Sequence, residues 1–240
     1  MKSLFLTLGL FLATTYLASG QSFFQETDRF LATHVHSGLI HYDSISKKPQ
    51  ALNQLIESIA AFQLAGTTPE EQKAFYINAY NLLVIKLIID NYPTEGPMSI
   101  PGFFNQKKVT VTNRSMTLDE LEKEILFEAF PDPRLHFVLV CAAVGCPPIS
   151  DFAYSPDSLE QQIQRKTESV LNTNWYVRVH KDKTYISKVF DWYREDFVTD
   201  STDVKAYINA FRKIAIPKNH PLEIYPYDWS LNDTKSSVRF

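Results

Sequence analysis

The stretch Asp132–Ile149, DPRLHFVLVCAAVGCPPI, is the part of the chain on which the predicted fold depends most. It contains both cysteines, Cys141 and Cys146, and one of the six histidines, His136. The run Leu135–Val140 is apolar except for that histidine, has the length of a strand and is rich in β-branched and aromatic residues, so we predict a buried strand. The loop of small residues that follows is a common place for a functional site. The segment indicates where a site lies, but not which reaction it performs.

The first 20 residues have the pattern of a secretory signal peptide. Lys2 supplies the positive charge, and Leu4–Leu17 is an apolar stretch shorter than the ~20 residues of a membrane span. Ala18 and Gly20 are small residues of the kind that signal peptidase recognises. We therefore predict a secreted or periplasmic protein with no stable membrane insertion after cleavage. An uncleaved anchor helix is the alternative.

The composition is that of a globular protein, with 45% hydrophobic residues, 13% aromatic residues and only 7 glycines. Because there is no repeat, low-complexity run or long linker, we predict a single domain over residues 21–240. The net charge of −3 and the lack of a basic stripe argue against nucleic acid as a partner. We expect no cofactor.

Two cysteines in an exported chain favour a disulfide between Cys141 and Cys146. A bridge over so short a loop constrains little chain entropy, so its use would be to fix the shape of the loop. The alternative is a reactive thiol with a resolving partner. Cys146 is then the better nucleophile, because it lies beyond a glycine-containing loop and could fold back.

The clearest helix is predicted over residues 69–91. Thr68 is its N-cap, a proline follows, and Glu71 completes a capping box. The middle of the segment is apolar almost all round, which predicts a central buried helix. Asn78 and Asn81 lie three apart on one face of it, so they either bind the backbone of a neighbouring loop or line a pocket.

The remaining elements are interleaved without a regular βαβ period, which predicts an α+β fold. We expect the helix over 69–91 to pack against the strand at 134–141, as part of a mixed or antiparallel sheet. Further helices and strands are expected around Phe23–Val35, Leu52–Ile59, Lys107–Thr112, Thr117–Leu126, Ser155–Val170, Trp175–Val179, Thr184–Val189, Val204–Phe211 and Leu222–Trp229.

Five motifs resemble the DUF547 family, a domain family of unknown function. They are FYINAYN (Phe75–Asn81), LDELE (Leu118–Glu122), the stretch Asp132–Ile149, ISKVFDWYREDF (Ile186–Phe197) and YDWSLN (Tyr227–Asn232). With the early segment THVHSGLIHY they extend over nearly all of the chain that follows the signal. The resemblance implies no particular reaction.

A more distant comparison is with papain-like and transglutaminase-like hydrolases, in which a cysteine at a helix N-terminus is followed by a histidine on a strand. Here the helix carries Asn78 and no cysteine. If the fold is of that type, the protein would therefore be a non-catalytic relative, or one in which Cys141 or Cys146 has become the nucleophile. This comparison is an analogy at the level of the fold.

His136 is the central residue of the predicted site. It is either a buried neutral imidazole with a structural hydrogen bond or a catalytic partner of Cys146 or Cys141. Asp191 or Asp228 could orient it. Arg134 is expected to form an ion pair with a carboxylate, with binding of an anionic ligand as the alternative.

The other histidines do not predict a metal site. His34 and His36 are two residues apart and point to different faces of a helix, and His41 lies beyond the break at Gly38. Surface or loop positions are expected for all three.

Two classes of function remain. In the first, favoured class, the protein is an exported module that binds a small molecule, peptide or glycan in a pocket near His136 and the 141–148 loop, with Asn78, Asn81 and Arg134 as further contacts. Aromatic residues beside carboxylates, as in the segment around Asp191, suit such ligands. In the second class, the protein is a thiol-dependent hydrolase or acyl transferase that uses Cys146 or Cys141 with His136.

Overall fold

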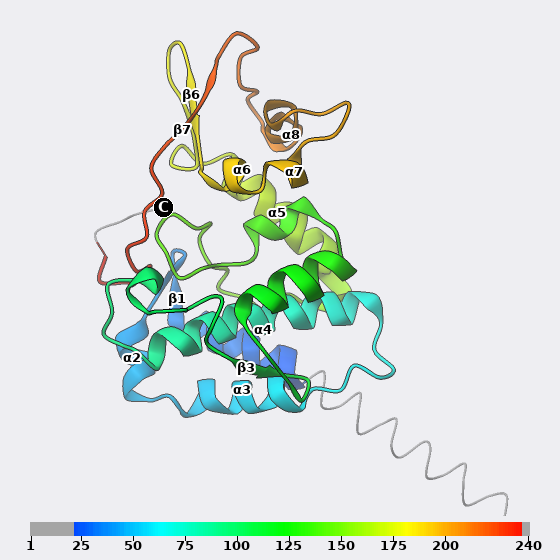
Figure 1. Ribbon diagram of the computed structural model, residues 1–240, viewed down its shortest axis with the longest axis vertical. Coiled ribbons are helices and arrows are strands. Elements are labelled where there is room, and N and C mark those ends of the chain that lie inside the picture. Colours follow the sequence, from blue (N-terminus) through cyan, green and yellow to red (C-terminus); the bar gives the residue numbers. More distant parts are fainter. Residues whose placement is uncertain (1–21, 237–240) are drawn as a thin grey trace, which may run out of the picture.

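The computed structural model describes residues 22–236 and shows an α+β fold (Figure 1). The predicted signal peptide, residues 1–20, lies outside the described residues. Within residues 22–236, none of the helices combines the length and the apolar character needed to cross a membrane.

The predicted helices are present in the predicted order, together with shorter helices that were not predicted. After a helix over 22–34, they are α2 (Tyr42–Lys47), α3 (Gln50–Ala61), α4 (Pro69–Ile89), the 3-10 helix η1 (Pro97–Ser99), the π-helix η2 (Glu120–Phe127), the 3-10 helices η3 (Pro133–Phe137) and η4 (Pro156–Ser158), α5 (Leu159–Leu171), α6 (Val189–Trp192), α7 (Arg194–Phe197) and α8 (Val204–Phe211).

The strands are short and form three small sheets. Strands β1 (Val35–His36) and β2 (Leu39–Ile40) form one hairpin, and β3 (Val109–Val111) and β4 (Arg114–Met116) form another. In the third sheet, β6 (Thr184–Ile186) lies between antiparallel β5 (Val177–Val179) and parallel β7 (Leu222–Ile224).

Helix α4 is the central buried helix, as predicted. The Thr68 side chain accepts a hydrogen bond from the Glu71 N–H at 3.2 Å, and Pro69 occupies the first turn. From Ala74 to Ile85 every residue is buried. Figure 1 shows α4 enclosed by α3 on one side and by η2 on the other. The fold is α+β, as predicted, and the elements packed most extensively on α4 are α3 and η2.

The predicted strand at 134–141 is wrong. Residues Pro133–Phe137 form the 3-10 helix η3, and the chain continues without regular structure to the cysteine loop. The segment is fully buried from Leu135 to Val140, so its apolar sequence is explained by burial alone. Asn81 of α4 pairs Val138 O and Val140 N–H, and the N–H groups of Val138 and Leu139 donate to Leu135 O.

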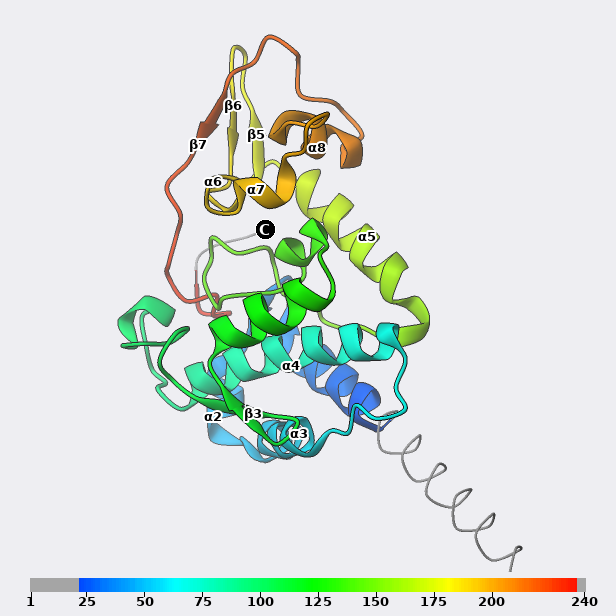
Figure 2. The ribbon, with the colours of Figure 1, turned by 45° about the vertical axis from the view of Figure 1, so that its right-hand side comes forward.

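Two clusters of buried side chains meet at η3. Leu135 packs into the larger cluster around α4, whereas Phe137 packs into a second cluster below the β5-β6-β7 sheet. Figure 2 shows α5 running from the helical layer up to this sheet, and the C-terminal strap, residues 225–236, running back down. The strap is held at the helical layer by hydrogen bonds from Ile40 N–H to Asn232 O (2.9 Å) and from Thr234 N–H to Ile40 O (3.0 Å).

Candidate functional site

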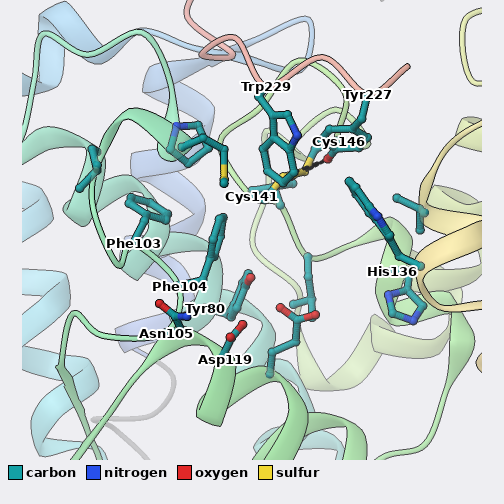
Figure 3. A pocket seen from close by; sticks show the side chains of 18 of the residues that line it. Tyr80, Phe103, Phe104, Asn105, Asp119, His136, Cys141, Cys146, Tyr227 and Trp229 are labelled. Atoms are coloured by element: carbon teal, nitrogen blue, oxygen red, sulfur yellow. Dashed lines mark hydrogen bonds between the residues drawn. A yellow bond between two sulfur atoms is a disulfide. The ribbon is translucent and has the colours of Figure 1, made fainter. Parts of the chain in front are cut away.

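A cavity of about 450 Å³ lies where these parts of the fold meet. In Figure 3 the cysteines, Tyr227 and Trp229 lie on one side of it, Phe103 and Phe104 on another, and His136 apart from both. The wall consists of Tyr80, Pro97, Met98, Ile100, Pro101, Gly102, Phe103, Phe104, Asn105, Asp119, Glu122, His136, Leu139, Val140, Cys141, Cys146, Pro147, Val189, Trp192, Tyr193, Tyr227 and Trp229.

The π-helix η2 brings one carboxyl group and one ring toward this region. Thr117 and Glu120 form the predicted capping box, with Thr117 N–H donating to Glu120 Oε2 at 2.6 Å and Glu120 N–H donating to Thr117 Oγ1 at 3.1 Å. In a π-helix, residues five apart lie near each other on the same face of the helix, and Glu122 and Phe127 are such a pair in η2. Glu122 lines the cavity, and the Phe127 ring stacks on His136 at 4.6 Å between centroids. Helices of this kind are frequent at functional sites.

Glu122 is a buried carboxyl group in the wall, with only 9% of its surface exposed. Burial raises its pKa, and hydrogen bonds with Tyr80 and Tyr193 offset this only in part. Asp119, one turn earlier, lines the same cavity and raises the pKa further. The floor of the cavity therefore presents two carboxyl groups and two phenol groups.

His136 is held by a hydrogen-bond partner that the sequence did not indicate. Its Nε2 lies 2.6 Å from Asp196 Oδ2, so Asp196 orients the ring, and neither Asp191 nor Asp228 does. The ring is sandwiched between Phe127 and Tyr193, with centroid distances of 4.6 and 4.1 Å. Burial lowers the pKa of His136, and the hydrogen bond with Asp196 opposes this shift only in part. Because the pKa lies below the ordinary value of about 6.5, the imidazole is mainly neutral at pH 7.

Cys141 and Cys146 form a disulfide, as predicted, and both line the cavity. Cys146 Sγ accepts hydrogen bonds from the Cys141 N–H at 2.9 Å and from the Tyr227 hydroxyl at 3.0 Å. The same hydroxyl lies 3.0 Å from Cys141 Sγ (Figure 3). In this oxidised state neither sulfur is a free nucleophile.

The strap holds the cysteine loop independently of the disulfide. Val144 N–H donates to Ser230 O and Gly145 N–H donates to Asp228 O, both at 2.8 Å. A Cβ added at Gly145 would lie 3.0 Å from backbone atoms of Asp228, so a side chain there would push loop and strap slightly apart. The two segments form one continuous wall.

Three aromatic rings cluster on the sheet side of the cavity. Tyr227 lies 4.7 Å from Trp229 and 4.9 Å from Trp192, measured between ring centroids. Trp192 is 44% exposed, an unusual position for an indole ring. The cluster gives the wall a broad apolar face beside its carboxyl groups.

The two asparagines of α4 are engaged by backbone and lie outside the wall. The Asn81 amide donates to Val138 O at 2.9 Å, and its oxygen accepts from Val140 N–H at 3.0 Å. Asn78 binds Tyr154 in the same two-sided way, at 2.8 and 3.0 Å. Of the two alternatives for these residues, the structure shows the backbone-binding one. Their predicted contact with a ligand has no support in this geometry.

Arg134 also lies outside the wall. Its guanidinium binds Asp132 at 2.8 Å and Glu160, and Asp132 in turn binds Lys73 at 2.8 Å. This is the carboxylate pairing that we expected, so of the predicted ligand contacts only His136 faces the cavity.

The N-terminal histidines show no metal site. His36 and His41 lie 6.4 Å apart between ring centroids, and His34 packs on Phe30. Over residues 22–236, no group of three histidine, cysteine or acidic side chains is placed to hold a metal ion.

Glu122 and Asp196 are the site residues that the sequence analysis did not single out as such. Glu122 lies within the motif LDELE and Asp196 within ISKVFDWYREDF. Glu122 was missed because an acidic residue in a predicted helix is normally exposed to solvent, and a π-helix has no clear sequence pattern. Asp196 was missed because it lies 60 residues after His136, so no local pattern indicates their contact.

Comparison with known proteins gives a family without a known activity. Residues 64–171 match the family model described as "Protein of unknown function, DUF547". No curated protein and no solved structure gives a significant match to the chain. The matched range contains α4, η2, His136 and the cysteine loop, but ends before Asp196 and the strap. The match over residues 64–171 supports assignment to the DUF547 family.

Proposed function

We propose that the protein is a binding module whose cavity takes a small organic ligand rich in hydrogen-bond donors, such as a sugar or a primary amine. The observation that carries this proposal is the composition of the wall, in which Asp119 and Glu122 face a cluster of aromatic rings. Convergent polar groups in a largely apolar concavity are the usual signature of a ligand site.

The charges of the wall select the kind of ligand. Its acidic side chains are Asp119 and Glu122, its histidine is held mostly neutral, and its 22 residues include neither lysine nor arginine. An anionic ligand would therefore meet carboxyl groups with no cation to compensate them. Donor hydroxyl or ammonium groups instead complement carboxylate and phenol oxygens.

The aromatic cluster and the size of the cavity support the same class. Faces of indole and phenol rings pack on the C–H faces of sugars and attract ammonium groups. A volume of about 450 Å³ lies within the range of small-ligand sites. The end of a peptide or glycan chain would fit, whereas a folded partner would not enter.

The proposed place of action is outside the cytoplasm, in the periplasm or the medium. A disulfide persists in an oxidising compartment, and the predicted signal peptide points the same way. The thiol hydrolase hypothesis gains no support from the structure, because it needs a reduced cysteine and both sulfurs are bonded to each other.

A titration with sugars, amino sugars and amines, followed by tryptophan fluorescence, tests the proposal. Trp192 and Trp229 line the cavity and Trp175 does not, so a saturable change should survive Trp175→Phe and shrink in Trp229→Phe. Glu122→Gln should weaken binding about tenfold or more, by removing a charged hydrogen-bond acceptor.

Glu124→Gln is the matched control, since Glu124 is exposed on the same helix and lies outside the wall. Equal affinity of the two glutamate variants, or a library in which only anions bind, would show that the cavity is not the site proposed.

A further inference from the structure

We propose that the Cys141–Cys146 disulfide exchanges with small-molecule thiols that enter the cavity, with Cys141 as the attacked sulfur and Cys146 as the leaving sulfur. This goes beyond ligand binding, because it gives the wall of the cavity a chemical activity of its own. The geometry around the two sulfurs is asymmetric, and the asymmetry carries the inference.

The first asymmetry is in access. Both cysteines line the cavity, but Cys146 is only 5% exposed whereas Cys141 is partly exposed. A thiol that enters the cavity therefore reaches Cys141 more easily. In thiol–disulfide exchange, the choice of the attacked sulfur depends on this access.

The second asymmetry is in hydrogen bonding. The Cys141 N–H donates to Cys146 Sγ at 2.9 Å, whereas the Tyr227 hydroxyl lies 3.0 Å from both sulfurs. Burial raises the pKa of Tyr227, so the phenol keeps its proton and can donate it to whichever sulfur becomes negative. The backbone N–H therefore makes Cys146 the favoured leaving sulfur, with the Tyr227 hydroxyl as a second donor, and donors placed in advance stabilise such charge.

The step balances with a thiol as the only co-reactant. The thiolate R–S⁻ attacks Cys141 Sγ, a bond forms between these sulfurs, and the bond to Cys146 breaks with its electron pair moving to Cys146 Sγ. This thiolate then takes a proton from solvent. A second thiol attacks the mixed disulfide and releases R–S–S–R, so two thiols are oxidised and the protein disulfide is reduced to two thiols.

The loop can undergo this cycle without unfolding. Its backbone is bound to the strap through Val144, Gly145 and Asn232, and Cys146 N–H donates to Ala143 O at 3.1 Å. A disulfide across so short a loop adds little stability. The loop shape is therefore fixed by the strap, and the disulfide remains free for exchange.

The test is the rate at which cysteamine or dithiothreitol, thiols without a carboxylate, opens the disulfide in native protein, measured by alkylation and mass spectrometry. We expect reduction without denaturant. Tyr227→Phe should slow it about tenfold, because one hydrogen bond to the leaving thiolate is lost. Tyr225→Phe is the matched control, as Tyr225 is buried in the same strap and is not bound to either sulfur.

Trapping experiments test the direction of the exchange. With cystamine, a disulfide that carries amino groups, Cys146→Ser should form a mixed disulfide at Cys141, and Cys141→Ser should react at least about tenfold more slowly through the buried Cys146. A disulfide that opens only after unfolding, equal rates for the two tyrosine variants, or preferential trapping at Cys146 would each overturn the proposal. Ligand binding in the cavity would be unaffected by any of these results.

Discussion

Replacing Asn81 by leucine should destabilise the protein strongly, although it places an apolar side chain in an apolar core. Asn81 is 4% exposed, and its amide is the partner of Val138 O and Val140 N–H at 2.9 and 3.0 Å. Leucine would leave a buried carbonyl and a buried N–H unpaired. Each such group costs about 1–3 kcal/mol, so the expected loss is about 2–6 kcal/mol of unfolding free energy.

Urea denaturation of wild type and Asn81→Leu measures this loss, and hydrogen exchange at the Val140 amide locates it. Asn53→Leu is the control, since Asn53 is exposed on α3 and its change should stay within about 0.5 kcal/mol of wild type. If Asn81→Leu is as stable as this control, the assignment of Asn81 as the partner of the buried segment is refuted.

Three further changes test other parts of the account. Ile85→Ala should cost about 2–5 kcal/mol in urea denaturation through a cavity beside α4, where Ile85 is 0% exposed, and a wild-type stability would contradict the core assignment. Burial raises the pKa of Asp132, but hydrogen bonds from Arg134 and Lys73 outweigh the effect of burial and lower the pKa to about 2. The Asp132 carboxylate therefore stabilises the fold above about pH 4, and this stabilisation is lost as the pH falls toward 2. The unfolding free energies of wild type and Asp132→Asn should converge over that interval, and a constant gap would argue against the ion pair. Burial lowers the pKa of His136, so wild type should lose stability as the pH falls below about 6.5, and His136→Gln should lack this loss.

The sequence was sufficient for elements that carry their own local signals. Helix α4 was predicted from Thr68, the following proline and Glu71, and the element at β3 from the segment Lys107–Thr112. These signals act over a few residues, so they need no knowledge of the rest of the fold.

The sequence was not sufficient where distant side chains complete the backbone. The run Leu135–Val140 reads as a strand because it is apolar, but Val138 O and Val140 N–H are paired by Asn81, which lies more than 50 residues earlier. Buried loops and buried strands have the same composition, and only the identity of the hydrogen-bond partner separates them.

The candidate site was predicted only in part, because some of its residues are distant from one another in sequence. His136, Cys141 and Cys146 belong to one segment and were recognised together. Glu122 and Asp196 join them only through the π-helix and through the packing of α7, which the sequence pattern does not reveal.

The central claim is that the cavity beside the disulfide is where a ligand binds. The most direct measurement is the change in backbone amide chemical shifts when the tightest sugar or amine from the titration is added to the isotope-labelled protein. The account predicts that the shifts concentrate at Phe103, Glu122, Cys141 and Trp229, four residues that line this cavity from different segments. Shifts centred instead on the separate hollow around Ser150 and Lys166, with the cavity wall unchanged, would contradict it.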